Sequence, residues 1–217
     1  MRQRVSTPGD RAAGWLAAAS AVTTLGALSC ARLSPNRNDP PPGRRTVEAA
    51  AHNTRQAPHQ RRLHLLLGLS NVLMIWPALR FPDQRQSRAM PLRATRLVAI
   101  AGELMMLVTM LAQARAWHAT ATGFYAATSD EEKLRTLDAM ARANTIWTKR
   151  FAVRLWGAWA GMTASLLAGT DRRVAAVSAA VAVPLVVAPP LPPLIFAARI
   201  GWCSTLALAL LRRRPQQ

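Results

Sequence analysis

Three polar side chains lie inside otherwise apolar runs of this sequence, and their chemistry needs an explanation. Glu103 is the single carboxylate in an apolar run of 18 residues, and Asn71 lies near the centre of another run. Arg199 lies about two helical turns into the last run. An ionisable group at mid-bilayer is unfavourable by several kcal/mol unless it faces a bundle interior and has a partner. Glu103, Asn71 and Arg199 are therefore the candidate site residues, and we expect Arg199 to pair with Glu103.

A carboxyl at this depth either stays neutral or ionises against a nearby cation, so it is suited to taking up and releasing a proton. The sequence therefore favours a helical bundle that handles a small solute or a proton. The alternative is a structural or assembly subunit of a larger membrane complex. A membrane-embedded enzyme ranks last, because the sequence contains no catalytic constellation such as Ser/His/Asp, paired carboxylates or HExxH. No catalytic residue is assigned.

Three methionines, Met105, Met106 and Met110, follow Glu103 on the same run, and thioethers are ligands that copper prefers. No Cys or His joins them there, and methionines commonly fill gaps in a packed interior. Cys30 and Cys203 lie in separate apolar runs, which indicates neither a disulfide framework nor a zinc site. We predict no metal and no cofactor.

The net charge of +18 comes mainly from arginines between the apolar runs. Clustered basic residues can bind nucleic acid, but no nucleic-acid-binding motif accompanies them. Arginines at the ends of apolar runs instead contact anionic lipid headgroups and fix orientation. The predicted partner is a bilayer with anionic headgroups, and no nucleic acid is expected.

The predicted fold class is all-α, a polytopic transmembrane helical bundle of about six spans. Apolar residues make up 51% of the chain and come in blocks, the pattern of a multi-pass membrane protein. Five spans are the alternative, because Pro184 interrupts a short fifth run. The predicted segments are a basic tail at 1–13, a span at 14–31, a polar Arg- and Pro-rich loop at 32–62, spans at 63–79 and 97–114, an amphipathic interfacial helix at 129–150, spans at 151–169, 174–188 and 191–211, and a basic tail at 212–217.

The N-terminal segment has more than one interpretation, and the predicted interfacial helix carries a specific start signal. The basic start followed by the first span also resembles a cleavable signal peptide, with an organellar transit peptide as the third alternative. We favour an uncleaved first helix. Ser129 and Glu132 form a capping box that opens the interfacial helix, and Trp147, Trp156 and Trp159 fit an aromatic belt beside it.

Small residues recur every four positions in the run at 151–169, at Gly157, Gly161, Ser165 and Gly169. Such a stripe lets another backbone approach closely. We expect it to pack against a helix of the same chain, with homodimerisation as the alternative.

An even number of spans puts both termini on one side of the membrane. The short loop between the second and third spans carries five arginines, which favours cytoplasmic termini. Ala-, Arg- and Pro-rich usage is typical of a high-GC genome. We therefore expect a bacterial plasma membrane, with an organellar membrane as the alternative.

Overall fold

The computed structural model describes residues 5–32, 45–81, 89–144, 147–168, 171–187, 192–212 and 214–215, and this part of the chain is almost entirely helical. Its helices are α1 (Pro8–Arg32), α2 (Val47–Arg80), α3 (Ala89–Ala126), α4 (Asp130–Asn144), α5 (Trp147–Leu167), α6 (Arg172–Val187) and α7 (Pro192–Leu211). Two-residue strands β1 (Val5–Ser6) and β2 (Arg214–Pro215) pair in parallel, which joins the two ends of the chain.

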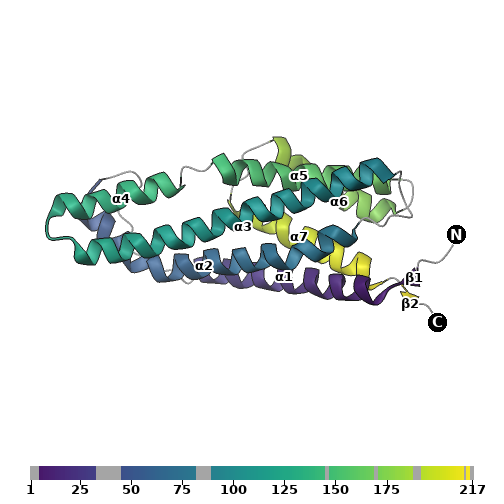
Figure 1. Ribbon diagram of the computed structural model, residues 1–217, viewed down its shortest axis with the longest axis horizontal. Helices are drawn as coiled ribbons and strands as arrows, with labels where there is room; N and C mark the ends of the chain where they lie inside the picture. The colour runs from purple at the N-terminus through teal and green to yellow at the C-terminus, as the bar shows by residue number, and fades with distance from the viewer. Residues whose placement is uncertain are drawn as a thin grey trace.

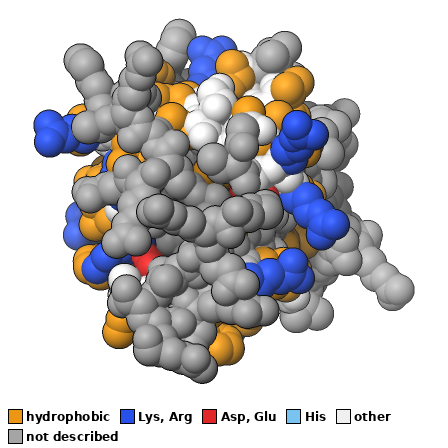
Figure 2. Space-filling model, turned by 90° about the vertical axis from the view of Figure 1, so that its right-hand side faces the viewer, with side chains coloured by type: hydrophobic (Ala, Val, Ile, Leu, Met, Phe, Trp, Pro, Cys, Tyr) orange, Lys and Arg blue, Asp and Glu red, His pale blue; other side chains and the backbone are white. Residues whose placement is uncertain are grey.

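The helices form one elongated bundle in which α2 and α3 run almost the full length (Figure 1). Helix α1 packs against α2 and α7, α3 packs against α2 and α5, and α6 packs against α5. Both termini lie at one end, and α4 lies near the other end beside the far halves of α2 and α3 (Figure 1). Basic side chains lie around the rim of the end that carries the termini (Figure 2).

The polar segment at 32–62 is not a loop throughout, because α2 begins at Val47. The Thr46 hydroxyl accepts a hydrogen bond from the Ala49 backbone N–H, and Glu48 adds a carboxylate to the first turn. Ala49, Ala50, Thr54 and Ala57 form a buried face of this segment. Arginines and histidines on the other faces mask this alanine face in the sequence, so our prediction of a loop over 47–62 was wrong.

The third predicted span, 97–114, is likewise only the middle of a longer helix, α3. The segment predicted as an interfacial helix contains α4, which ends at Asn144 and packs along α3 and α2. Its capping box forms as expected, since Ser129 Oγ accepts from the Glu132 N–H. The Glu132 carboxylate accepts hydrogen bonds from the Thr128 backbone N–H and hydroxyl and from the Ser129 N–H, which together lower its pKa.

Three helices of the described chain are long and apolar enough to cross a membrane, namely α1, α2 and α3, which is fewer than the six predicted. Helix α7 contributes a shorter apolar segment, Ile195–Leu211. Helix α5 begins among basic residues and carries an exposed Arg154, and α6 has only 16 residues and contains Pro184. The structure is therefore an all-α bundle with three candidate membrane-spanning helices.

Exposed apolar side chains form a band around the bundle, which we call the apolar belt. On α2 it extends from Leu65 to Leu79, and on α3 from Leu97 to Leu111. Basic residues lie at both margins of the belt. Arg61 and Arg80 on α2 are about 28 Å apart along the helix, and Arg93 and Arg115 on α3 are about 33 Å apart, at a rise of about 1.5 Å per residue. Both spacings match the ~30 Å hydrocarbon core of a bilayer.

The small-residue stripe on α5 faces α6 of the same chain. A Cβ atom on Gly157 would lie 2.6 Å from Val186 Cγ2, and one on Gly161 would lie 3.6 Å from Ala182 Cβ. Ser165 is exposed and donates to the Gly161 carbonyl, and Gly169 lies outside the described residues. Gly157 is thus the member of the stripe at which the close helix approach depends on the absence of a side chain.

Candidate functional site

A buried ion pair joins α7 to α3 in the interior of the bundle. Arg199 Nη1 lies 2.5 Å from Glu103 Oε1, and Arg199 Nη2 donates to Glu103 Oε2 at 2.7 Å. Glu103 is fully buried and Arg199 is 5% exposed. The planar guanidinium therefore binds both carboxylate oxygens, the geometry that gives the strongest charge-assisted contacts. This is the pairing expected from the sequence.

Helix α2 adds the third candidate residue to the pair. Arg199 Nη2 also donates to Asn71 Oδ1 at 3.3 Å and approaches the Ser70 carbonyl oxygen at 3.5 Å. The Asn71 amide donates in turn to the Leu67 carbonyl at 2.6 Å, which holds its oxygen toward Arg199. Glu103, Asn71 and Arg199 thus meet at one site although they come from three helices.

Trp156 of α5 completes the enclosure of the guanidinium. Its ring centroid lies 4.3 Å from Arg199 Cζ, within the range of a cation–π contact. Gly102, the residue before Glu103, makes this approach possible, because a Cβ atom there would lie 3.1 Å from Trp156 Cδ1. The prediction of an aromatic belt missed this role: Trp156 and Trp159 are buried, and Trp159 packs edge-to-face on Trp202.

Helix α1 contributes a cluster of hydroxyl groups next to the ion pair. Ser20 Oγ lies 2.7 Å from Ser70 Oγ and donates to the Ser70 carbonyl, the same oxygen that Arg199 approaches. Thr24 Oγ1 lies 2.9 Å from Ser70 Oγ, and Cys203 Sγ lies 3.5 Å from Ser20 Oγ. These buried groups did not figure among the candidate residues. The four-residue spacing of Ser20 and Thr24 in an alanine-rich run is the signal that could have revealed them.

The site lies at the middle level of the apolar belt. Asn71 is one residue from the midpoint between Leu65 and Leu79, and Glu103 is one residue from the midpoint between Leu97 and Leu111. Both residues are therefore about 15 Å from the hydrocarbon boundaries when a core of ~30 Å is centred on the belt. This is the depth at which an unpaired charge is most unfavourable.

These contacts can hold a charged carboxylate in the buried interior of the bundle. The hydrogen bonds of Arg199 would change if that carboxylate took up a proton. A neutral Glu103 would no longer bind both guanidinium nitrogens as acceptor, while Arg199 would keep Asn71, the Ser70 carbonyl and the Trp156 ring as partners. Among the described residues no group of three or more His, Cys, Asp or Glu side chains could hold a metal ion. The groups that meet at the site are hydrogen-bond donors and acceptors, one of which is a carboxyl group that can take up a proton.

No protein-family model, curated protein or solved structure matches this chain.

Proposed function

We propose that the protein is an integral membrane protein that handles protons, or a small solute with exchangeable protons, at the Arg199–Glu103 centre. In this proposal α1, α2, α3, α5, α6 and α7 cross a bacterial plasma membrane, and both termini are cytoplasmic. The observation that carries the proposal is the doubly hydrogen-bonded, buried ion pair at the middle level of the apolar belt. Intramembrane ionisable pairs of this kind commonly belong to proton relays and ion pathways.

In this proposal, protonation of Glu103 also changes the hydrogen bonds of the neighbouring hydroxyl groups between α1 and α2. Ser70 connects Arg199 to Ser20 through its carbonyl and to Thr24 through its hydroxyl. Serine and threonine hydroxyls both donate and accept, so a change in the hydrogen bonding of Arg199 can reorient the cluster. Proton uptake at α3 is in this way coupled to contacts between α1 and α2.

Proton flux into liposomes tests the proposal. Purified protein is reconstituted with a pH-sensitive dye inside the vesicles, a pH gradient is imposed, and its decay is followed with valinomycin present to prevent a membrane potential. We expect the wild-type protein to accelerate the decay over protein-free vesicles, and the double variant Glu103→Gln/Arg199→Gln to lose the acceleration. Equal decay with both proteins, at equal incorporation, would show that the pair does not handle protons.

A structural or assembly subunit is the second candidate, and Arg154 is the observation that favours it. This arginine of α5 is exposed only two residues from Trp156, near the level of the ion pair, and has no ion-pair partner among the described residues. A neighbouring subunit that supplies a carboxylate would shield such a charge from lipid. Purification from native membranes should then recover a stoichiometric partner that Arg154→Lys retains and Arg154→Asp releases. Recovery of the protein alone would refute this candidate.

A further inference from the structure

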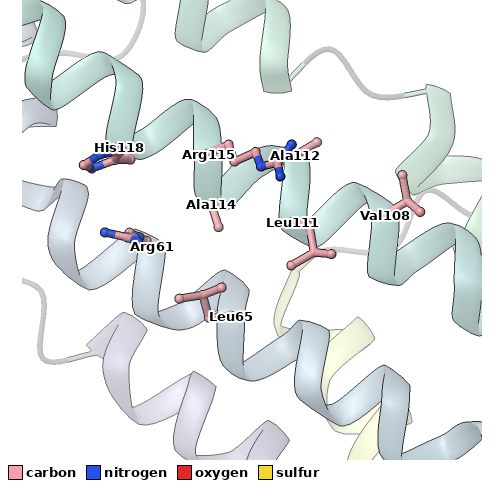
Figure 3. Close-up of a pocket in the computed structure, with 8 residues that line it drawn as sticks. All are labelled: Arg61, Leu65, Val108, Leu111, Ala112, Ala114, Arg115 and His118. Atoms are coloured by element: carbon pink, nitrogen blue, oxygen red, sulfur yellow. The ribbon is translucent and has the colours of Figure 1, made fainter.

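A groove on the outer surface of the bundle lies between α2 and α3. It encloses about 440 Å³, and its lining divides into two parts by chemistry. One part is apolar, with Leu65, Val108 and Leu111, and the other is basic, with Arg61, Arg115 and His118. Figure 3 shows Arg61 and His118 at the same gap between the two helices, with Leu65 and Leu111 farther along it.

The depth of the groove matches the structure of one bilayer leaflet. Arg61 lies ten residues before Asn71, and Arg115 lies twelve residues after Glu103, which is about 15 and 18 Å from the middle level of the apolar belt. The hydrocarbon half-thickness of a bilayer is about 15 Å. The basic part is therefore at the level of the headgroup phosphates, and the apolar part extends into the acyl region of the same leaflet, at the end away from the termini.

The basic side chains of the groove have no partner among the residues that the structure describes. Arg61, Arg115 and His118 are exposed, and their side chains make no ion pair or hydrogen bond with any described residue. None of the described residues that line the groove is acidic. Arg80, at the opposite margin of the belt, differs because it packs over the Trp76 ring. The positive charge in the groove is therefore free to bind an anion.

We propose that the groove binds one molecule of an anionic glycerophospholipid. The phosphate would accept hydrogen bonds from the two guanidinium groups, and an acyl chain would lie on the exposed faces of Leu65, Val108 and Leu111, which are 43%, 66% and 44% exposed. Basic pockets between transmembrane helices recognise anionic headgroups in this way. The inference rests on the membrane placement proposed above, but it does not depend on proton handling by Glu103.

Native mass spectrometry of the detergent-solubilised full chain tests the site. Dioleoyl phosphatidylglycerol and dioleoyl phosphatidylcholine are titrated separately, and the fraction of lipid-bound protein is compared for the wild type and Arg61→Gln/Arg115→Gln. The matched control is Arg62→Gln/Arg93→Gln, which removes the same charge from exposed positions of the same helices outside the groove.

We expect the wild type and the control to bind the first phosphatidylglycerol at least about tenfold more tightly than the groove variant, the equivalent of one lost charge-assisted contact. Phosphatidylcholine should bind all three proteins equally and weakly. Equal weakening of the groove variant and the control would refute a defined site, and equal binding of both lipids by the wild type would refute headgroup recognition. Displacement of the bound lipid by millimolar inorganic phosphate would show that the basic part binds free anions, which would overturn the lipid assignment. Flotation of wild-type protein with liposomes checks membrane integration separately, so failure of that premise is distinguishable from failure of the lipid site.

Discussion

Removing one member of the Arg199–Glu103 pair should destabilise the protein more than removing both. Breaking a buried ion pair by a single substitution costs about 3–5 kcal/mol, because the remaining charge is buried without compensation. In Glu103→Gln the guanidinium keeps Asn71, the Ser70 carbonyl and the Trp156 ring, at 3.3, 3.5 and 4.3 Å. Because arginine cannot lose its proton, these contacts and the amide oxygen of the substituted side chain, all of them neutral, are its only compensation, and we expect a loss of about 3 kcal/mol.

Arg199→Gln should behave differently, because a carboxyl group can take up a proton. No other described side chain donates to Glu103, so the folded variant is expected to hold a neutral carboxyl group. The unfolded chain holds an ionised one, and protonating an ordinary glutamate of pKa about 4.3 costs about 3.7 kcal/mol at pH 7 and about 1 kcal/mol at pH 5. The loss in this variant should therefore shrink as the pH falls, whereas the loss in Glu103→Gln should not.

The measurement is equilibrium unfolding in mixed micelles of SDS and dodecyl maltoside, followed by circular dichroism at pH 7 and pH 5. The double variant Glu103→Gln/Arg199→Gln should lose less than either single variant. The exposed pair Arg135–Glu131 on α4 provides a matched control, and its coupling energy should be at most about 0.5 kcal/mol. Additive losses at the buried pair, or an Arg199→Gln loss that is the same at both pH values, would refute the reasoning.

Three further predictions concern other parts of the chain. Gly157→Ala should lower the free energy of unfolding by about 1–3 kcal/mol, because the added methyl group collides with α6. Gly26→Ala in α1 meets no atom within 4 Å and should leave the free energy of unfolding the same or raise it by up to about 1 kcal/mol, because alanine is the better helix former; equal melting of both variants would contradict the close approach. The amide NMR signals of Thr128 and Ser129 should titrate with a midpoint below the ordinary glutamate pKa of about 4.3. The ionised Glu132 carboxylate accepts their hydrogen bonds and stabilises the start of α4, and this contribution is lost as the pH falls through the lowered pKa of Glu132; a midpoint at about 4.3 or above would contradict this. If the termini are cytoplasmic, a membrane-impermeant thiol reagent outside the cell should label Tyr125→Cys, which replaces a side chain 76% exposed, and should miss Ser87→Cys; the opposite pattern would invert the topology.

The sequence predicted the site better than it predicted the extent of the helices. An ionisable residue in an apolar run needs a partner, and few partners are available, so Glu103 and Arg199 could be matched from their positions within the apolar runs. Helix length is a weaker signal, because α2 and α3 continue into polar sequence where hydropathy no longer marks them. Their far halves are held by alanine faces and by α4, and such local packing is visible only once the helices are side by side.

Trp156 shows why the complete site could not be predicted. A tryptophan near the start of an apolar run fits an interfacial belt as well as it fits a buried contact. What decides between the two is Gly102, on a different helix, which leaves room for the indole ring beside Glu103. That juxtaposition depends on the packing of α3 against α5, and neither residue carries a local signal of it.

The ion pair also accounts for the way in which the helices meet. A buried pair is weak evidence for stability, because well-packed apolar residues can replace such a pair without loss. A buried pair can nevertheless determine how helices pack, because a charge at mid-bilayer depth is stable only in a helix arrangement that supplies its partners. Arg199 needs Glu103 of α3, Asn71 of α2 and the Trp156 ring of α5 at once, and a shift of α7 by one turn, about 5.4 Å, would break all three contacts. The pair therefore selects one register of α7 among apolar helix surfaces that would otherwise slide. Under the proposed function, a proton delivered to Glu103 would loosen that register, and the same residues would serve both assembly and proton handling.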